Sequence, residues 1–219
     1  MSVRPRLKVC CMQDEQEIRL AVAAGASAVG LVSAMPSGPG PIDEDRIAAL
    51  ARLVPPGVSA FLLTSLTTAE EIAAQQRRLA VDTLQMVDHV PPDQLVRLRR
   101  ELPGIRLVQV IHVEGPEAVE EARAVAPLVD ALLLDSGRPK AAVKELGGTG
   151  RTHDWAVSAR LCREVPVPVF LAGGLNPDNV AAAVAAVEPY GVDVCSGLRV
   201  GGALDPERLR RFSTALGRG

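Results

Sequence analysis

The stretch VFLAGGLNPDNVAAAVAAVEPYGVDVCSGL, residues 169–198, decides the fold. It opens with a short apolar run, Val169–Ala172, which is typical of a buried strand. After two glycines, valines recur at the three- and four-residue spacing that gives a helix one apolar face. A second apolar run, Val192–Cys195, follows the helix. A strand, a helix and a strand in this order predict two parallel strands with the helix packed across them.

The same strand and helix patterns alternate along the rest of the chain. Each predicted strand is a short run rich in Val, Leu and Ile, and each predicted helix has apolar residues three and four apart. Residues that commonly begin helices stand at Asp43, at Thr67 or Thr68, and at Asn176-Pro177-Asp178. The eight predicted strands are Leu7–Cys10, Ala28–Val32, Val58–Leu63, Thr83–Met86, Arg106–Ile111, Ala131–Asp135, Val169–Ala172 and Val192–Cys195.

Eight strand–helix units in 219 residues average about 27 residues each. Parallel strands at this spacing most often close into a barrel, although an open, doubly wound sheet is built from the same units. No Pro-, Gly- or Ser-rich linker divides the sequence. We therefore predict an α/β fold, a single (β/α)8 TIM barrel with a parallel eight-stranded core, as one domain spanning residues 1–219.

The composition limits the partners that the chain can have. Its 24 Lys and Arg and 26 Asp and Glu residues give a formal net charge of −2. A broad positive face, which nucleic acid or an anionic membrane would need, is therefore not expected. The first residues lack the apolar core of a signal peptide, and no apolar run reaches the roughly 18 residues that span a bilayer. We expect a cytoplasmic protein with neither partner.

The four cysteines, Cys10, Cys11, Cys162 and Cys195, do not show the paired spacing of a metal site. Cys10 and Cys11 are adjacent, so their side chains would point to opposite faces of a strand. We interpret all four as thiols and predict no metal site.

Glycine is concentrated after the sixth, seventh and eighth predicted strands, in Gly147-Gly148-Thr149-Gly150, Gly173-Gly174 and Ser196-Gly197. In barrels of this kind, the loops after the last two strands commonly present main-chain amides to a phosphate group. Glycines also serve simply to permit tight turns. Because the three clusters share one rim, we favour the first interpretation and predict a phosphorylated small molecule as the ligand.

Five sequence blocks stand in order along nearly the whole chain: Lys8-Val9-Cys10, Leu133–Ser136, Gly147–Gly150 with Asp154-Trp155, Leu171–Val180 and Tyr190–Gly197. In this order they resemble phosphoribosylanthranilate isomerase, the barrel enzyme of tryptophan biosynthesis. The resemblance implies an Amadori rearrangement, in which an N-linked phosphoribosyl aldose becomes a 1-amino-1-deoxy ketose. It also implies that the reaction needs no cofactor.

The resemblance assigns roles to particular residues. The reaction needs an acid that protonates the ring oxygen and a base that takes the C2 proton of the imine, and these groups correspond to Asp135 and Cys10. A thiolate base requires a lowered pKa, for which Lys8 on the same strand face is a suitable neighbour. The acid requires a pKa that is raised by burial. The predicted substrate-binding residues are Lys8, Gln85, Gly148, Gly173, Gly174, Ser196 and Gly197.

Four positions depart from the family pattern. Cys11 stands where the family usually has glycine, and Gly40 stands where an arginine typically binds the anthranilate carboxylate. Val87 replaces the histidine of a Gln-Leu-His-Gly segment, and Arg199 replaces the usual glutamate. The candidates to replace the lost cation are Arg199, Arg151, His112 and His89.

Three functions are open on the sequence alone. The chain is a phosphoribosylanthranilate isomerase with a relocated carboxylate contact, an isomerase or lyase for another phosphoribosylated or phosphosugar substrate, or a phosphosugar-binding protein without activity. We rank them in this order because Cys10 and Asp135 are retained. The Ser33–Pro41 loop is either a mobile lid or a rigid cover. We expect a monomer or a homodimer.

Overall fold

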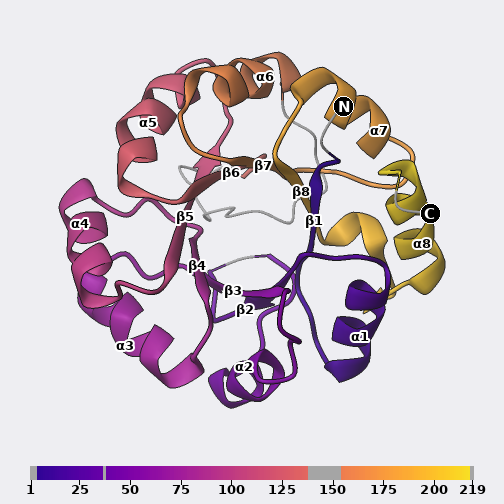
Figure 1. Cartoon of the computed structure of the whole chain (residues 1–219), viewed down its shortest axis with the longest axis horizontal. Coiled ribbons are helices and arrows are strands. Elements are labelled where there is room, and N and C mark those ends of the chain that lie inside the picture. Colours follow the sequence, from indigo (N-terminus) through magenta and orange to yellow (C-terminus); the bar gives the residue numbers. More distant parts are fainter. Residues whose placement is uncertain (1–3, 37, 138–153, 218–219) are drawn as a thin grey trace.

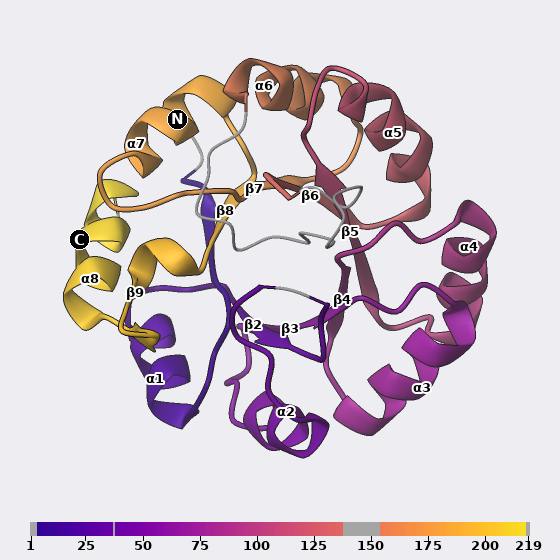
Figure 2. The same ribbon diagram turned by 180° about the vertical axis from the view of Figure 1, so that it is seen from behind.

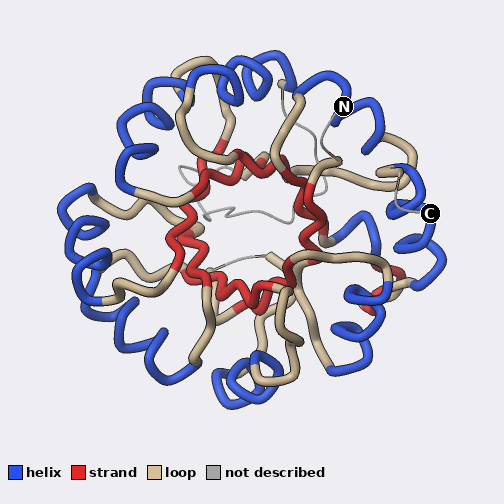
Figure 3. The backbone as a smooth tube through the Cα atoms, viewed as in Figure 1, coloured by secondary structure: helices blue, strands red, loops and turns tan. Residues whose placement is uncertain are grey.

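The computed structural model describes residues 4–36, 38–137 and 154–217. Its core is a closed barrel of eight parallel strands in sequential order, surrounded by a ring of helices (Figure 1, Figure 3). Since β1 pairs with β8, the predicted (β/α)8 barrel is confirmed and the open sheet is excluded. The strands are β1 (Arg6–Val9), β2 (Ala28–Val32), β3 (Ser59–Thr64), β4 (Thr83–Met86), β5 (Arg106–His112), β6 (Ala131–Asp135), β7 (Val169–Leu171) and β8 (Gly191–Val194).

Several helices begin at residues that cap them. Asp14, Asp43 and Thr68 each accept a hydrogen bond from the main-chain amide three residues further on, which satisfies a donor that the first turn leaves free. The starts predicted at Asp43 and Thr68 are thus confirmed. The helices are α1 (Glu15–Ala23), α2 (Glu44–Ala51), α3 (Ala69–Leu79), α4 (Pro92–Glu101), α5 (Ala118–Val125), α6 (Trp155–Glu164), α7 (Val180–Val187) and α8 (Pro206–Ala215).

Helix α7 begins later than the sequence predicts. Asn176 Oδ1 accepts hydrogen bonds from the amides of Asp178 (2.9 Å) and Asn179 (3.2 Å). Asn179 Oδ1 in turn accepts from the amide of Asn176 (2.8 Å). These side chains bind amides in a turn, so the helix starts only at Val180.

Side chains alternate between the two faces of each strand and build two apolar clusters. One cluster fills the space between the strands and the helices and includes Leu7 and Ile111. The other fills the barrel interior and includes Val108, Val110 and Leu133. The last residues of β5 and β6, His112 and Asp135, lie two positions beyond Val110 and Leu133. They therefore also face inward, at the carboxyl end of the barrel.

The sequence did not predict the segment between β8 and α8. A short 3-10 helix, η2 (Ser196–Leu198), leads into an antiparallel hairpin of β9 (Arg199–Val200) and β10 (Ala203–Leu204). The hairpin lies beside α8 and α1 when the molecule is seen from behind (Figure 2). A second 3-10 helix, η1 (Ala126–Leu128), precedes β6. Strands of two residues are too short to give a periodic pattern.

No helix in the described ranges is both long and apolar enough to cross a bilayer. Within the same ranges, no group of three or more His, Cys, Asp or Glu side chains is placed to hold a metal ion.

Candidate active site

Polar side chains face into the barrel at the carboxyl ends of several strands. Gln85, His112 and Asp135 occupy the interior positions of β4, β5 and β6, in step with apolar residues of the interior cluster. Cys10 directly follows β1 and belongs to the interior cluster itself. These four residues lie at the end of the barrel where (β/α)8 enzymes carry their active sites.

A buried ion pair lies in the barrel beside Cys10. Lys8 of β1 is fully buried, and its Nζ atom is 2.8 Å from Oδ2 of Asp193, its register partner on β8. The same Nζ atom is 5.2 Å from the centre of the Phe61 ring. Burial acts to lower the pKa of Lys8, but Asp193 and Cys10 outweigh it and the pKa is raised, so the ammonium stays charged. The predicted contact of Lys8 with a substrate stays a prediction.

Cys10 is a free thiol that is 4% exposed. A Cβ atom on Gly30 would lie 2.6 Å from its sulfur, so the sulfur rests against the backbone of β2. Burial raises the pKa of the thiol to about 11, because Lys8 offsets only part of the desolvation and Asp193 adds negative charge. The lowered pKa that a thiolate base requires is therefore not found in the free site. Lys8 acts in the expected direction, but Asp193 balances its charge.

Asp135 ends β6 and is paired in register with His112 at the end of β5. Its Oδ1 atom accepts a hydrogen bond from the amide of Ser136 (2.7 Å). Burial raises the pKa of the carboxyl group, and the negative charge of Asp193 adds to this effect. The Ser136 amide and His112 oppose it without cancelling it. A raised pKa is the direction that a general acid needs, as the sequence analysis required.

Asp193 connects the two candidate catalytic groups. Its charge acts on both Cys10 and Asp135, and it lies on the interior face of β8, between the strands that carry them. The structure thus brings the thiol and the carboxyl group to the same end of the barrel. This arrangement can hold a small molecule between a proton donor and a proton acceptor.

The loops after β7 and β8 meet at the predicted phosphate site. Gly173 and Gly174 have φ angles of 82° and 65°, which glycine adopts without strain. A Cβ atom on Gly197 would lie 2.0 Å from the carbonyl oxygen of Leu175, so glycine is required for the two loops to pack this closely. A cavity of about 420 Å³ lies beside these loops, and its lining includes Gly174, Ser196, Gly197, Arg208 and Arg211.

Main-chain amides in these loops are available to a ligand. Within the described part of the chain, the amides of Gly174 and Gly197 donate to no acceptor. The side chains of Asn179 (2.9 Å) and Asn176 (3.4 Å) both donate to the carbonyl oxygen of Gly174, which fixes the loop. Free amides on a fixed loop suit a phosphate group. The predicted binding residue Gly148 lies outside the described residues.

Comparison with known proteins decides the family. Residues 7–215 match the family model of N-(5'phosphoribosyl)anthranilate (PRA) isomerase. The chain belongs to the phosphoribosylanthranilate isomerase family. It is 39% identical over 212 residues to the N-(5'-phosphoribosyl)anthranilate isomerase of Haloferax volcanii, a match that covers 96% of this chain and 92% of the relative.

Solved structures agree with this assignment. The phosphoribosyl anthranilate isomerase of Thermus thermophilus superimposes with a TM-score of 0.82 at 27% identity, covering 97% of this chain and 98% of that one. TrpF from Jonesia denitrificans superimposes with a TM-score of 0.78 at 30% identity, covering 97% of each chain. The barrel and its strand order are therefore those of phosphoribosylanthranilate isomerases.

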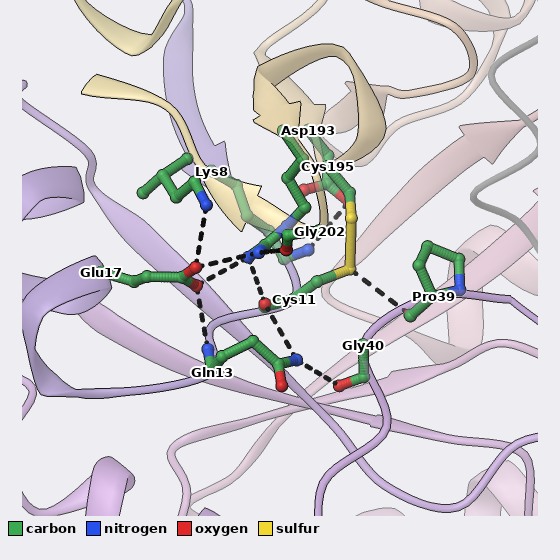
Figure 4. The surroundings of a disulfide bond; sticks show 11 residues. Lys8, Cys11, Gln13, Glu17, Pro39, Gly40, Asp193, Cys195 and Gly202 are labelled. Atoms are coloured by element: carbon green, nitrogen blue, oxygen red, sulfur yellow. Dashed lines mark hydrogen bonds and ion pairs between the residues drawn. A yellow bond between two sulfur atoms is a disulfide. The ribbon is translucent and has the colours of Figure 1, made fainter.

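Two cysteines of this phosphoribosylanthranilate isomerase family member form a disulfide bond (Figure 4). Cys11, in the loop after β1, is bonded to Cys195, at the end of β8, with 6.1 Å between their Cα atoms. The prediction of four thiols is therefore wrong for this pair, whereas Cys10 and Cys162 are free. The two residues are 184 positions apart and meet only because the barrel closes between β1 and β8.

Cys11 also packs against Gly40, the position at which the resemblance implies an arginine. A Cβ atom on Gly40 would lie 2.6 Å from the Cβ atom of Cys11, and Gly40 has a φ angle of +93°. Gln13 lies against both residues and donates from Nε2 to the carbonyl oxygens of Gly40 (3.0 Å) and Cys11 (3.4 Å) (Figure 4). Packing against Cys11 therefore excludes any side chain at position 40.

Arg199, a further departure from the family, belongs to the same cluster. Its guanidinium donates to both carboxylate oxygens of Glu17, at 2.9 and 2.7 Å, and to the carbonyl oxygen of Cys11. Both side chains are less than a tenth exposed. Arg199 thus connects the loop after β1 to the β9–β10 hairpin and is not available to a substrate carboxylate.

The remaining candidates for the lost cation differ in position. His89 is exposed and lies 3.7 Å from a carboxylate oxygen of Glu121. Arg151 lies outside the described residues. His112 alone of the described candidates occupies an interior position at the mouth of the barrel.

Two site residues were not singled out from the sequence. Gly30 admits the sulfur of Cys10, and a glycine inside a strand is a recognised sign of close packing. The carboxylate of Asp193 balances the charge of Lys8. A carboxylate inside an apolar strand indicates that it has a buried partner of opposite charge.

Proposed function

We propose that this chain is a phosphoribosylanthranilate isomerase that converts N-phosphoribosyl anthranilate into the corresponding 1-amino-1-deoxy ketose. One observation carries the proposal. Cys10 and Asp135 occupy one end of the barrel, each within electrostatic reach of Asp193, and the loops at Gly174 and Gly197 have free amides. Membership of the family supports the same activity.

The first chemical step belongs to Asp135. Its raised pKa keeps the carboxyl group protonated closer to neutral pH than an ordinary aspartate. The acid gives its proton to the ring oxygen of the sugar while the bond between that oxygen and C1 breaks. The lone pair on the amine nitrogen then forms a double bond to C1, which leaves an iminium cation and an open chain.

The second step belongs to Cys10. The thiolate removes the proton from C2, and the electrons of that bond form a C1–C2 double bond and neutralise the iminium. Loss of the C2 hydroxyl proton and protonation at C1 then give the ketone, so hydrogen moves from C2 to C1 and no external oxidant is consumed. The thiol has a pKa of about 11, and the iminium charge beside it favours the thiolate.

The other end of the substrate is a phosphate. The amides at Gly174 and Gly197 can donate to its oxygens, and Arg208 supplies positive charge to the adjoining cavity. Arg211 also lines this cavity, but its charge is balanced by an ion pair with Asp178. Anchoring the phosphate here would place the sugar over the middle of the barrel, between Cys10 and Asp135. Fixed orientation of this kind contributes a large part of the rate enhancement of many enzymes.

We further propose that the protein acts in the cytoplasm, as a single domain that is a monomer or a homodimer, without a nucleic-acid partner. The net charge of −2 supports the last point, since nucleic-acid binding depends on concentrated positive charge.

A second candidate function rests on Gly40. Because packing against Cys11 excludes an arginine there, the carboxylate of anthranilate lacks the contact that the resemblance implies. An isomerase for a phosphoribosylated amine without this carboxylate would need no such contact. Cys10 and Asp135 would act in the same way.

The test is a turnover assay with purified protein. Phosphoribosylanthranilate is supplied, its fluorescence is followed, and rescue of a tryptophan auxotroph that lacks this step is scored in parallel. We expect turnover, and we expect Cys10→Ala and Asp135→Asn to abolish it. Cys162→Ser changes the other free thiol and is the matched control.

The outcomes separate the candidates. Absence of both turnover and rescue would reject anthranilate as the amine. Turnover of another phosphoribosyl amine, lost in Cys10→Ala, would then establish the second candidate. Binding of ribose 5-phosphate without conversion of any phosphoribosyl amine would reject both enzymatic functions.

A further inference from the structure

His112 is the last residue of β5 and faces the mouth of the barrel. Val108 and Val110, two and four positions earlier, belong to the interior cluster, whereas Ile111 packs outside the barrel. Alternation along the strand therefore turns His112 inward. Its register partner on β6 is the candidate acid Asp135.

One ring nitrogen of His112 is held by the protein. Its Nε2 atom is 2.9 Å from the carbonyl oxygen of Val87 at the end of β4. A carbonyl oxygen only accepts hydrogen bonds, so Nε2 carries the hydrogen. The neutral ring then presents the lone pair of Nδ1 as an acceptor.

The other ring nitrogen has no partner. His112 Nδ1 is buried and makes no hydrogen bond within the described ranges. The same is true of Oε1 of Gln85, whose residue is 3% exposed and lies on the adjacent strand β4. Buried polar atoms without partners are rare in native proteins. Two of them on neighbouring strands, beside the candidate acid, indicate a ligand that supplies hydrogen-bond donors.

We propose that His112 is a substrate-binding residue whose Nδ1 atom accepts a hydrogen bond from a hydroxyl group of the ribosyl moiety. This deepens the proposed function and rests on it. Of the groups on a phosphoribosyl amine, the phosphate and the aryl carboxylate are acceptors and would face a lone pair without a hydrogen between them. The donors are the sugar hydroxyls and the amine N–H, and in an anthranilate the N–H already donates to the ortho carboxylate, which leaves the hydroxyls. They lie on the same sugar ring as the oxygen that Asp135 protonates.

Two substitutions separate this role from a structural one. In His112→Asn, the amide is attached at the same point as Nδ1, so an acceptor stays near that position and the contact with Val87 is lost. In His112→Gln, the amide reaches the position of Nε2, so the contact with Val87 is kept and the Nδ1 acceptor is lost. The pair therefore removes the two ring nitrogens one at a time.

The readout is kcat/KM for phosphoribosylanthranilate, with urea unfolding as the check on folding. We expect His112→Gln to lose about 10- to 100-fold in kcat/KM, the effect of one hydrogen bond made in a desolvated site, and His112→Asn to stay within a few-fold of the wild type. The reverse order, with Gln active and Asn impaired, would show that His112 only anchors the end of β4, and the proposal would fall.

A second substrate distinguishes the sugar from the carboxylate. With phosphoribosylaniline, which lacks the carboxylate, the ratio of wild-type to His112→Gln activity should equal that found with phosphoribosylanthranilate. A ratio that falls to one would assign His112 to the carboxylate and overturn the proposal.

Equilibrium binding of ribose 5-phosphate tests the contact between His112 and the sugar without any turnover. It should weaken in His112→Gln and not in His112→Asn, even if no amine is turned over. Equal affinity of the two variants for ribose 5-phosphate would contradict the proposal, whether or not the turnover assay supports the proposed function.

Discussion

The pKa of Cys10 is set by opposing effects of its surroundings. Burial raises its pKa to about 11, while Lys8 favours the thiolate and Asp193 disfavours it. A base acts deprotonated, so its active fraction rises with pH. Asp135 acts protonated, and its active fraction falls as the pH rises through its raised pKa. With a thiol pKa of about 11, the form that has the Cys10 thiolate and the protonated Asp135 together is a minor form near neutral pH, and the substrate must favour it on binding.

The reactivity of Cys10 should follow from this pKa. In Cys162→Ser, we expect the rate of alkylation of Cys10 by iodoacetamide to rise about tenfold per pH unit from pH 7 to 9, because only the thiolate reacts and its fraction grows in this way below the pKa. Mass spectrometry of the peptide that contains Cys10 measures the rate. A plateau below pH 8 would mean that the site lowers the pKa.

Gly30 should control the position of the thiol. In Gly30→Ala, the new Cβ atom meets the Cys10 sulfur at 2.6 Å and Lys8 Nζ at 3.2 Å, so the sulfur must move. We expect kcat/KM to fall about 100-fold, the usual effect of displacing a catalytic group by about 1 Å. Gly104→Ala is the control, since its Cβ atom would have nothing within 4 Å. Full activity of Gly30→Ala would show that the sulfur can occupy another position.

Among the elements, the junction of α1 with the β9–β10 hairpin depends on Glu17. Its carboxylate accepts hydrogen bonds from Arg199, Gln13 and Leu204. Burial acts to raise the pKa of Glu17, but these hydrogen bonds outweigh it and the pKa is lowered. A lowered pKa means that the charged form stabilises the fold above its ordinary pKa, and that this stability is lost as the pH falls through the folded value.

Glu17→Gln should therefore destabilise the protein in a pH-dependent way. At pH 7 we expect the free energy of unfolding to fall by about 3 kcal/mol, because Arg199 is left buried and unpaired. The difference from the wild type should shrink as the pH falls below about 4.5. Urea unfolding at several pH values measures it. Glu207→Gln, in an exposed pair with Arg210, should have no measurable effect, and a pH-independent loss in Glu17→Gln would contradict the assignment.

The elements themselves could largely be predicted from the sequence. Every predicted strand agrees with the structure to within one residue at each end, because short apolar runs between polar caps mark buried parallel strands clearly. The start of α7 was predicted too early, since Asn176 and Asn179 bind amides that a helix would otherwise use. The β9–β10 hairpin was missed because it depends on a distant carboxylate, Glu17, rather than on a local pattern.

At the scale of the whole molecule, closure of the barrel determines which parts of the site the sequence could reveal. Cys10 and Asp135 could be predicted, since each ends a strand and matches a family block. Asp193, Gly30 and the Cys11–Cys195 bond are properties of strand neighbours, and β1 becomes a neighbour of β8 only when the barrel closes. The departures at Cys11, Gly40 and Arg199 were recognised separately, and only the structure shows that they contact one another.

The disulfide bond makes a prediction for the protein as a whole. Unfolded without reductant, the chain should show two free thiols, and after reduction it should show four. Reduction should lower the melting temperature by roughly 5 to 15 °C, because a bond that closes a long loop contributes about 2–4 kcal/mol. Cys162→Ser should show one thiol fewer both before and after reduction, and reduction should lower its melting temperature by the same amount. Four thiols before reduction would contradict the bond. In the cytoplasm, glutathione would act against it.

The position of this bond has a topological consequence. It joins residues separated by 184 positions, so nearly the whole backbone becomes a covalent macrocycle with short tails. A protease that nicks any one loop between the two cysteines would open the ring without releasing a fragment. The nicked protein would migrate as two pieces on a denaturing gel only after reduction, because the Cys11–Cys195 bond alone would hold the pieces together.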